Sequence, residues 1–168
     1  MSAAGPPQSA NSTRSGGSAA AQPQAWGDHT SDREFMAAHA MGPRVEGVAL
    51  VAKDGFSARY DLDRTHGVFC RPGHKLAGES YRDRILVLDA AKGGVASAWM
   101  LHEMKARGIT PLALVFNSVN PIMAQGAALA DLTMLAGFDC DITSMLASGA
   151  RLELIPEQRL LRLLAPES

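Results

Sequence analysis

The residues best suited to chemistry gather in the stretch LVLDAAKGGVASAWML, Leu86 to Leu101, where an apolar run passes through a glycine pair into an expected helix. Gly93 and Gly94 let the backbone approach an anion closely, and N–H groups at a helix start point toward it with a favourable dipole. Lys92 adds a positive charge, and the Ser97 hydroxyl in the first turn could reach the same anion. The stretch predicts a clamp for a carboxylate or similar anion, although it lacks the GxxxxGK[ST] pattern of a P-loop.

These residues, and one nearby histidine, also have ordinary structural interpretations. Strand-to-helix turns often contain glycine without holding a ligand, and Ser97 is placed equally well to cap or decorate its helix. His74, in the loop GHKLAGES, either borders a cleft and binds substrate or is a structurally bonded or exposed loop histidine. The residue types alone leave the roles of Ser97 and His74 open.

Metal chemistry has little support in this chain. Cys70 and Cys140 lie far apart in sequence, and neither belongs to a CxxC pair. Zinc and iron–sulfur sites usually draw three or four ligands from one constellation, which two isolated cysteines do not supply. We therefore expect no metal ligands here and interpret both cysteines as small buried hydrophobic residues.

The elements that would position the anion site follow from apolar runs. Residues 84–89, RILVLD, are typical of a strand buried on both faces, and a helix is expected over residues 94–107. A second buried strand, residues 112–116, then completes a right-handed parallel βαβ unit. The expected apolar side of the helix consists of Val95, Trp99, Met100 and Met104.

Further elements are expected on both sides of this unit. Asn120 and Pro121 begin a helix that is expected to run to Gly137, before a short strand at residues 138–142. Two early strands within residues 45–62 are expected to form a hairpin at Asp54–Gly55, because DG is a hairpin dipeptide. A closing hairpin is expected over residues 150–164, with its turn at Pro156–Gln158.

Composition divides the chain into a tail and one domain. Residues 1–43 are built from Ser, Ala, Gly, Pro and Gln, so we expect a disordered low-complexity tail, with a short helix over residues 31–41. Residues 44–168 are expected to form a single α/β domain.

The bulk composition limits the classes of partner. The 168 residues are 46% hydrophobic and 20% charged, which is typical of a soluble globular protein. The net charge of −1 gives no electrostatic reason to expect nucleic acid or an anionic membrane surface as a partner. No apolar run reaches the roughly 18 residues that span a bilayer, and the N-terminus lacks the apolar core of a secretory signal. We therefore expect a cytoplasmic protein.

Four segments, taken in order, resemble the swivelling domain of the aconitase X family. These segments are GVALVAKDG, GHKLAGES, RILVLDAAKGGVASAW and NPIMAQGAALAD. They match a family loop like HPL-G-S-AG at His74–Ser80, a strand entering a Gly/Ser-rich turn at Leu86–Ser97, and a PI-A-GA helix at Pro121–Ala127. The resemblance covers about residues 44–165, essentially the whole expected domain.

This resemblance implies an aconitase-like swivelling β/β/α fold, with a βαβ core and flanking antiparallel strands. It also implies the small subunit of a dehydratase whose iron–sulfur cluster is held by a separate large catalytic subunit, which agrees with the cysteine count. In aconitase-like enzymes a serine of the swivelling domain acts as the base, which makes Ser97 the catalytic candidate. Many relatives place serines directly after the turn glycine, where this chain has Gly94 and Val95, so Ser97 is displaced from that pattern.

The substrate-binding candidates are Lys92, Gly93, Gly94 and His74. Family activities include dehydration of cis-3-hydroxy-L-proline in bacteria and of phosphomevalonate in archaea. The Ala/Arg-rich composition with a Gly/Ser-rich tail favours cis-3-hydroxy-L-proline, with phosphomevalonate as the alternative. A stand-alone swivelling carrier or regulatory module is a third hypothesis, and a phosphohistidine carrier would need His74 to be exposed.

Overall fold

Two buried parallel strands form the centre of the fold, as the apolar runs predict. The computed structural model describes Gly5 and residues 32–166. RILVLDAA forms β5 (Arg84–Ala91) and ALVFNS forms β6 (Ala113–Ser118), and the two strands pair in parallel. Helix α1 (Val95–Ala106) joins them. The predicted βαβ unit is confirmed.

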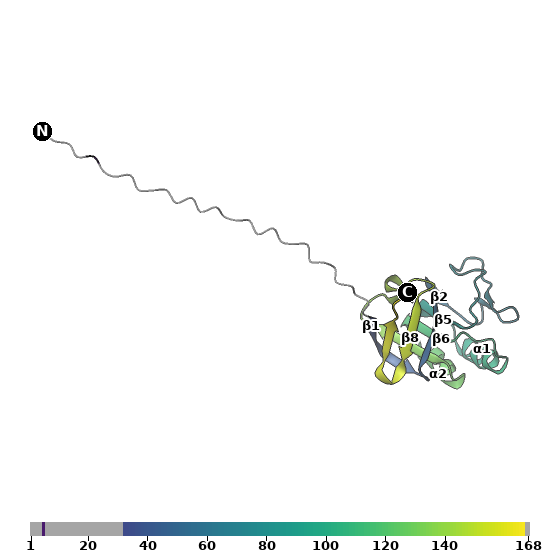
Figure 1. The fold of residues 1–168 in the computed structure, drawn as a ribbon. Helices are drawn as coiled ribbons and strands as arrows, with labels where there is room; N and C mark the ends of the chain where they lie inside the picture. Colours follow the sequence, from purple (N-terminus) through teal and green to yellow (C-terminus); the bar gives the residue numbers. More distant parts are fainter. Residues whose placement is uncertain (1–4, 6–31, 167–168) are drawn as a thin grey trace.

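Seven strands close into a barrel in the order β1-β7-β6-β5-β2-β8-β9, and β9 pairs back with β1 (Figure 1). Strands β2, β5, β6 and β7 are parallel neighbours, whereas β1, β8 and β9 pair in antiparallel fashion. The expected α/β class, with a βαβ core and flanking antiparallel strands, is confirmed. The remaining bounds are β1 (Arg33–Met41), β2 (Val45–Phe56), β3 (Leu62–Asp63), β4 (Val68–Phe69), α2 (Pro121–Leu129), β7 (Thr133–Phe138), α3 (Ile142–Met145), β8 (Arg151–Ile155), η1 (Pro156–Gln158) and β9 (Leu160–Leu163).

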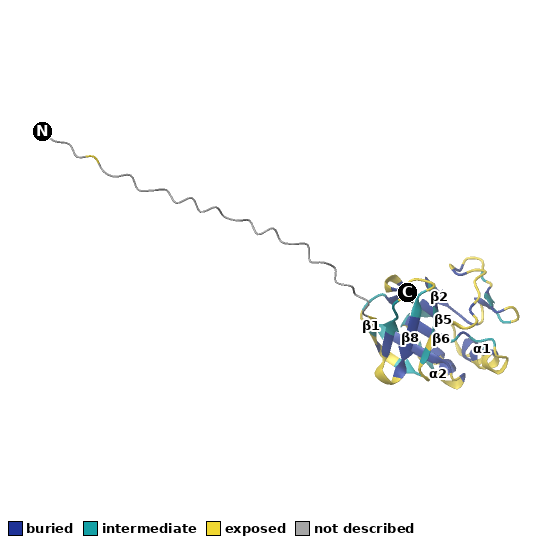
Figure 2. Ribbon diagram, viewed as in Figure 1, coloured by how far each residue is buried: buried dark blue, intermediate teal, exposed yellow. Residues whose placement is uncertain are grey.

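The central strands are apolar throughout because both of their faces are covered. Ile85 and Val87 of β5 belong to a cluster inside the barrel, which also includes residues of the antiparallel strands. Leu86 and Leu88 face the other way and pack with buried residues of α1 and α2, such as Leu101. Figure 2 shows the barrel strands largely in the colour of buried residues, and the helices with exposed outer faces. The helices therefore cover one side of the barrel.

Strand β1 overturns the helix expected over residues 31–41 and moves the start of the domain. The segment REFMAAHAM pairs with β7 at one end and with β9 at the other. Its alanines favour a helix in isolation, but the hydrogen bonds offered by two open strand edges outweigh that propensity. The ordered domain therefore begins at Arg33 rather than at residue 44. The rest of the expected disordered tail, residues 1–4 and 6–31, lies outside the described residues.

The hairpin expected at Asp54–Gly55 is wrong, because β2 runs straight through this dipeptide. Its register with β5 shifts between Ala52 and Gly55, which is a local bulge in a continuous strand. A Cβ on Gly55 would lie 2.3 Å from the Lys92 side chain, so the glycine permits close approach rather than a chain reversal. Residues 57–83 then leave the barrel as an excursion beside α1 (Figure 1).

The second helix begins as expected and ends early. Asn120 accepts a hydrogen bond from Met123 N at 2.8 Å and Pro121 occupies the first turn, but α2 ends at Leu129. Residues 133–137, expected to be helical, form β7 together with Phe138, and of the short strand expected at residues 138–142 only Phe138 is in a strand in the described chain. The pairing of β7 with both β1 and β6 decides its conformation. The closing hairpin, β8–η1–β9, is confirmed with its turn at residues 156–158.

Two of the expected apolar residues of α1 lie on its exposed side. Met104 is buried, but Val95 and Trp99 are exposed, and the buried face instead uses Ser97, Ala98 and Leu101. Across residues 32–166 no helix has the length and apolar character needed to cross a membrane.

Candidate functional site

The carboxyl ends of β2 and β5 meet at one rim of the barrel, and polar residues follow both strands. Ser57 comes directly after β2, and the turn Lys92–Gly94 comes directly after β5. An open cavity of about 290 Å³ lies beside them, lined by Ser57, Tyr60, Asp61, Arg71, Lys92 and Gly93. Ligands of α/β sheets gather at the carboxyl ends of the strands. This rim is therefore the candidate functional site.

The glycine turn between β5 and α1 contains the predicted binding residues Gly93 and Gly94. Gly93 has φ +112°, and Gly94 is the N-cap residue of α1. The Asn120 side chain donates to the carbonyl oxygens of Ala91 at 3.3 Å and Gly93 at 3.2 Å, which ties the turn to the start of α2. No described residue accepts a hydrogen bond from the N–H groups of Gly93 or Gly94. These two donors, at a helix start, suit an anion.

Lys92 supplies the positive charge of the site. Its main-chain N–H donates to Phe56 O at 2.7 Å, and its side chain lies across the Gly55 backbone. The Lys92 ammonium makes no ion pair with any residue that the structure describes. It is therefore available to a ligand in the cavity.

Arg71 is a second cation at the cavity, and two aspartates fix its position. Its Nε donates to Asp61 Oδ1 at 2.5 Å, and its Nη2 lies 3.4 Å from Asp54 Oδ1. The hydrogen bond to Asp61 raises the pKa of Arg71 above its ordinary value. Because Asp61 already accepts from Arg71, the guanidinium contributes less net charge to the cavity than Lys92 does.

Two serines meet beneath the glycine turn. Ser57 Oγ and Ser97 Oγ lie 3.2 Å apart, and the side chains of both residues are almost entirely covered. Ser57 lines the cavity, whereas Ser97 does not. The predicted candidates Lys92, Gly93 and Ser97 are thus brought together, and the catalytic role of Ser97 stays a prediction.

His74 is buried, and the main chain occupies both of its ring nitrogens. Nε2 lies 3.0 Å from Gly55 O, and Nδ1 accepts from Leu76 N at 3.0 Å. This pattern places the proton on Nε2, and the ring stacks on Phe69 with centroids 4.7 Å apart. His74 therefore stabilises the β2 bulge at Gly55, and the Lys92 side chain packs against the same glycine. It does not meet the requirement of an exposed histidine, so a phosphohistidine carrier is not supported.

Sequence reasoning missed four residues that line this site, Ser57, Tyr60, Asp61 and Arg71. The expected hairpin at Asp54–Gly55 placed Ser57 inside a strand rather than directly after one. Interpreting residues 45–56 as one continuous strand would have found Ser57, since a serine that directly follows a parallel strand lies at the ligand edge of the sheet.

The chain's own residues do not fit an iron–sulfur cluster. Cys70 is exposed and Cys140 is half-buried, so the expectation that both are buried hydrophobic residues is wrong. Within residues 32–166, no three His, Cys, Asp or Glu side chains are grouped so as to hold a metal ion. Any cluster would need ligands from a partner.

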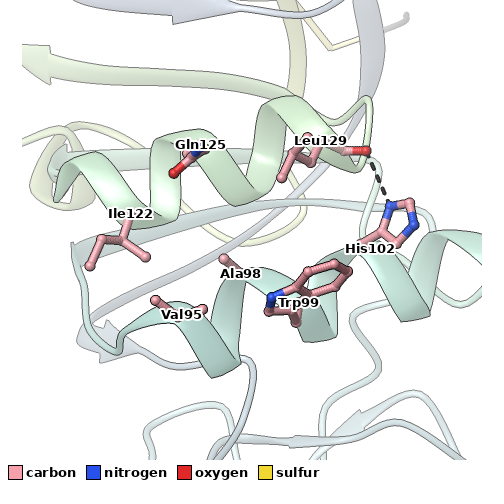
Figure 3. Close-up of a pocket in the computed structure, with 7 residues that line it drawn as sticks. All are labelled: Val95, Ala98, Trp99, His102, Ile122, Gln125 and Leu129. Atoms are coloured by element: carbon pink, nitrogen blue, oxygen red, sulfur yellow. Dashed lines mark hydrogen bonds between the residues drawn. The ribbon is translucent and has the colours of Figure 1, made fainter.

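A second concavity, an apolar groove of about 340 Å³, lies between α1 and α2 (Figure 3). Trp99 of α1 and Leu129 of α2 stand at its sides, both exposed, and His102 Nδ1 lies 3.2 Å from Leu129 O. Val95, the first residue of α1, lines this groove and directly follows Gly94 of the glycine turn. The groove has few polar groups and holds none of the cations of the rim.

Comparisons with known proteins agree with this architecture. The family model of the aconitase X swivel domain matches residues 34–163. The phosphomevalonate dehydratase small subunit of Methanococcoides burtonii is 30% identical over 109 residues, covering 65% of this chain and 80% of that protein. The protein of the same name from Thermococcus sibiricus is 31% identical over 112 residues, covering 67% and 84%.

A solved structure shares the fold. The crystal structure of Thermococcus kodakaraensis aconitase X in its holo-form superposes with a TM-score of 0.73 at 22% identity, covering 79% of this chain and 99% of that chain. The family model spans all seven barrel strands and the rim between β2 and β5. The chain belongs to the aconitase X swivel-domain family.

Proposed function

We propose that this chain is the small subunit of a two-chain hydro-lyase of the phosphomevalonate dehydratase type. The observation that carries the proposal is the match to several proteins named phosphomevalonate dehydratase small subunit, of which this chain spans 80% to 84% in the examples above. These names favour phosphomevalonate, the alternative substrate, over cis-3-hydroxy-L-proline, the substrate expected from composition.

The rim suits a substrate with negatively charged groups. Phosphomevalonate carries a carboxylate and a phosphate, and the rim offers the Lys92 ammonium, the Arg71 guanidinium and the free N–H groups of Gly93 and Gly94. These groups would bind and orient one anionic end of the substrate. Since residues 32–166 contain no group of His, Cys, Asp or Glu side chains that could hold a metal ion, a large subunit would hold the iron–sulfur cluster and close over the cavity.

The test is a reconstitution of the two-chain enzyme. The full chain is coexpressed under anaerobic conditions with the aconitase X-type large subunit of its own genome, and dehydration of phosphomevalonate and of cis-3-hydroxy-L-proline is measured. Turnover of phosphomevalonate by the mixture, and by neither chain alone, is the expected result. Turnover of cis-3-hydroxy-L-proline alone would overturn the proposed substrate.

A charge variant tests the anion clamp in the same enzyme. Lys92→Met should raise KM for phosphomevalonate about tenfold to a hundredfold, because a charge-assisted hydrogen bond contributes about 1.5–3 kcal/mol. Lys105→Met is the matched control, since Lys105 is exposed in the last turn of α1, at the end away from the rim. Equal KM values for the two variants would remove Lys92 from the clamp.

A further inference from the structure

The two serines beneath the turn differ in what they face. Ser57 is 6% exposed and contributes to the cavity lining, so its remaining accessible surface opens toward a ligand. Ser97 is 2% exposed and belongs to the buried face of α1. A hydroxyl that contacts substrate needs a path to the cavity, and only Ser57 has one.

Gly93 lines the cavity and lies close to Ser97, which does not line it. A Cβ built on Gly93 would lie 2.4 Å from Ser97 Oγ but 3.4 Å from Ser57 Oγ. The side of Gly93 on which a Cβ would lie therefore faces the Ser97 hydroxyl, and no side chain fits between them. Because Gly93 lines the cavity and Ser97 does not, a ligand in the cavity meets Gly93 before it meets Ser97.

The direction of the hydrogen bond between the serines follows from the partners of each. Ser57 Oγ is the only acceptor within reach of the Ser97 hydroxyl among the described residues. A buried hydroxyl proton without an acceptor would cost about 1–3 kcal/mol, and only the Ser57 proton has a second outlet, a ligand in the cavity, so Ser97 donates to Ser57 when a ligand is bound. The Ser57 proton is then directed away from Ser97 and into the cavity, and accepting a bond strengthens Ser57 as a donor.

Hydrogen bonds with Asp61 hold the main chain of Ser57 in place beside the cavity. Ser57 N donates to Asp61 Oδ2 at 2.7 Å, and Asp61 N donates back to Ser57 O at 2.9 Å. Arg71 fixes the other oxygen of Asp61. The hydroxyl is thus carried on a tight turn whose geometry a salt bridge maintains, which favours preorganised binding.

We infer that Ser57 is the residue whose hydroxyl contacts the substrate, donating to an anionic oxygen held beside Lys92. Ser97 is a positioning residue that acts through Ser57 by fixing the direction of its proton. The inference rests on the proposed function for the identity of the substrate, but not for which hydroxyl faces the cavity.

The first test measures access directly, on the full chain and without a substrate. Ser57→Cys and Ser97→Cys are alkylated with iodoacetate, a small carboxylate, and labelling at each position is followed by mass spectrometry with Cys70 as an exposed internal reference. The thiol introduced by Ser57→Cys should react at least about tenfold faster than the one introduced by Ser97→Cys. Equal rates, or faster reaction at position 97, would overturn the inference.

The second test is a double-mutant cycle in the reconstituted enzyme. Ser57→Ala should lower kcat/KM about a hundredfold, and Ser97→Ala about tenfold, with urea midpoints unchanged. When Ser57→Ala is already present, adding Ser97→Ala should lower kcat/KM by less than about twofold, because the Ser57 hydroxyl through which Ser97 acts is then absent. A purely structural role of Ser97 would instead cost the same factor in both backgrounds, and that result would overturn the positioning role.

Failure of the proposed function gives a different pattern. If the wild-type enzyme dehydrates cis-3-hydroxy-L-proline rather than phosphomevalonate, the substrate is wrong and the same cycle is measured on hydroxyproline. If it dehydrates neither, the alkylation rates of the two thiols decide the inference alone.

Discussion

Gly93 and Gly94 are adjacent in the turn before α1, but their surroundings differ. Gly93 has φ +112°, where side chains are strained, and a Cβ there would meet Ser97 Oγ at 2.4 Å. Gly94 has φ −116° and nothing within 4 Å of its Cβ position. One glycine is needed for the geometry of the site, and the other is not.

This difference predicts opposite results for two alanine substitutions. Gly93→Ala should lower the free energy of unfolding by about 1–3 kcal/mol and abolish most turnover, because the turn must move off the serine pair. Gly94→Ala should cost less than about 1 kcal/mol, the loss of a weak N-cap. Urea unfolding of the chain and kcat/KM of the two-chain enzyme measure both effects. Equal losses in the two variants would contradict the geometry.

Sequence reasoning finds site residues when their local pattern carries the signal. Lys92 and Gly93 stand in a strand–glycine–helix pattern, and both line the cavity. Arg71 lies far from them in sequence and reaches the rim only because the excursion folds back over β2, held by Asp61 and Asp54. No periodicity or motif in the sequence indicates that residues 57–83 fold back toward the rim, so the position of Arg71 could not be predicted.

At the scale of elements, α1 has one face on the barrel and one in the open groove. Leu101 is fully buried against the strands, whereas Trp99 is 65% exposed although it is the larger side chain. Size and hydrophobicity therefore do not rank the contributions of these residues to stability, and burial does.

Alanine at each position separates the two faces. Leu101→Ala should lower the free energy of unfolding by about 2–5 kcal/mol, since it removes buried methyl groups and leaves a cavity. Trp99→Ala should lower it by no more than about 1 kcal/mol, since most of the indole already contacts water. Chemical denaturation of the isolated chain measures both. A larger loss for Trp99→Ala would mean that the indole is packed rather than exposed.

Asp141 joins three elements, because it caps α3 and also binds β2 and β6. It accepts hydrogen bonds from Lys53 Nζ at 2.8 Å, Asn117 Nδ2 at 2.8 Å and Thr143 Oγ1 at 2.6 Å. The Lys53 bond, followed by those of Thr143 and Asn117, holds the pKa of Asp141 far below its ordinary value of 3.8. The carboxylate therefore stays ionised in the folded chain at pH values where the unfolded chain is protonated.

The lowered pKa of Asp141 makes the folded chain less stable as the pH falls into the acid range. The ionised Asp141 carboxylate contributes its full stabilisation above pH 3.8, the ordinary pKa that applies in the unfolded chain. This stabilisation decreases below pH 3.8 and is lost as the pH falls through the pKa of Asp141 in the folded chain. Asp141→Asn should thus lower the urea midpoint at pH 7, and its difference from the wild type should shrink progressively below pH 3.8. A difference that is constant down to pH 2.5 would contradict the role of the charge.

The accuracy of the expected elements follows the strength of their local signals. β5, β6, the start of α2 and the closing hairpin have long apolar runs, a cap or a turn, and all four form where they were predicted. β1 and β7 contain REFMAAHAM and TMLAGF, which are rich in residues that suit a helix. Only their pairing with each other and with β9 and β6 makes them strands, and pairing partners are not visible in a local pattern.

At the scale of the whole molecule, the α/β class was predictable but the closure of the barrel was not. Closure depends on β1, which is the only described strand that joins the parallel group at β7 to the hairpin at β9. A mixed sheet without β1 would end in two unpaired edges, one on β7 and one on β9. The strand also brings Ala37 into the interior cluster of the barrel.

The domain boundary can be tested by two truncations that differ by twelve residues. A chain that starts at Arg44 lacks β1, so β7 and β9 lose their ladder partners and the barrel interior opens to water. It should lose the cooperative urea transition, followed by circular dichroism, and should aggregate through its free edges. A chain that starts at Asp32 keeps all seven strands, along with the hydrogen bond from Ala165 N to Asp32, and should unfold cooperatively. If the shorter chain unfolded at the same urea midpoint as the longer one, β1 would be an accessory strand, and the barrel would not need closure to be stable.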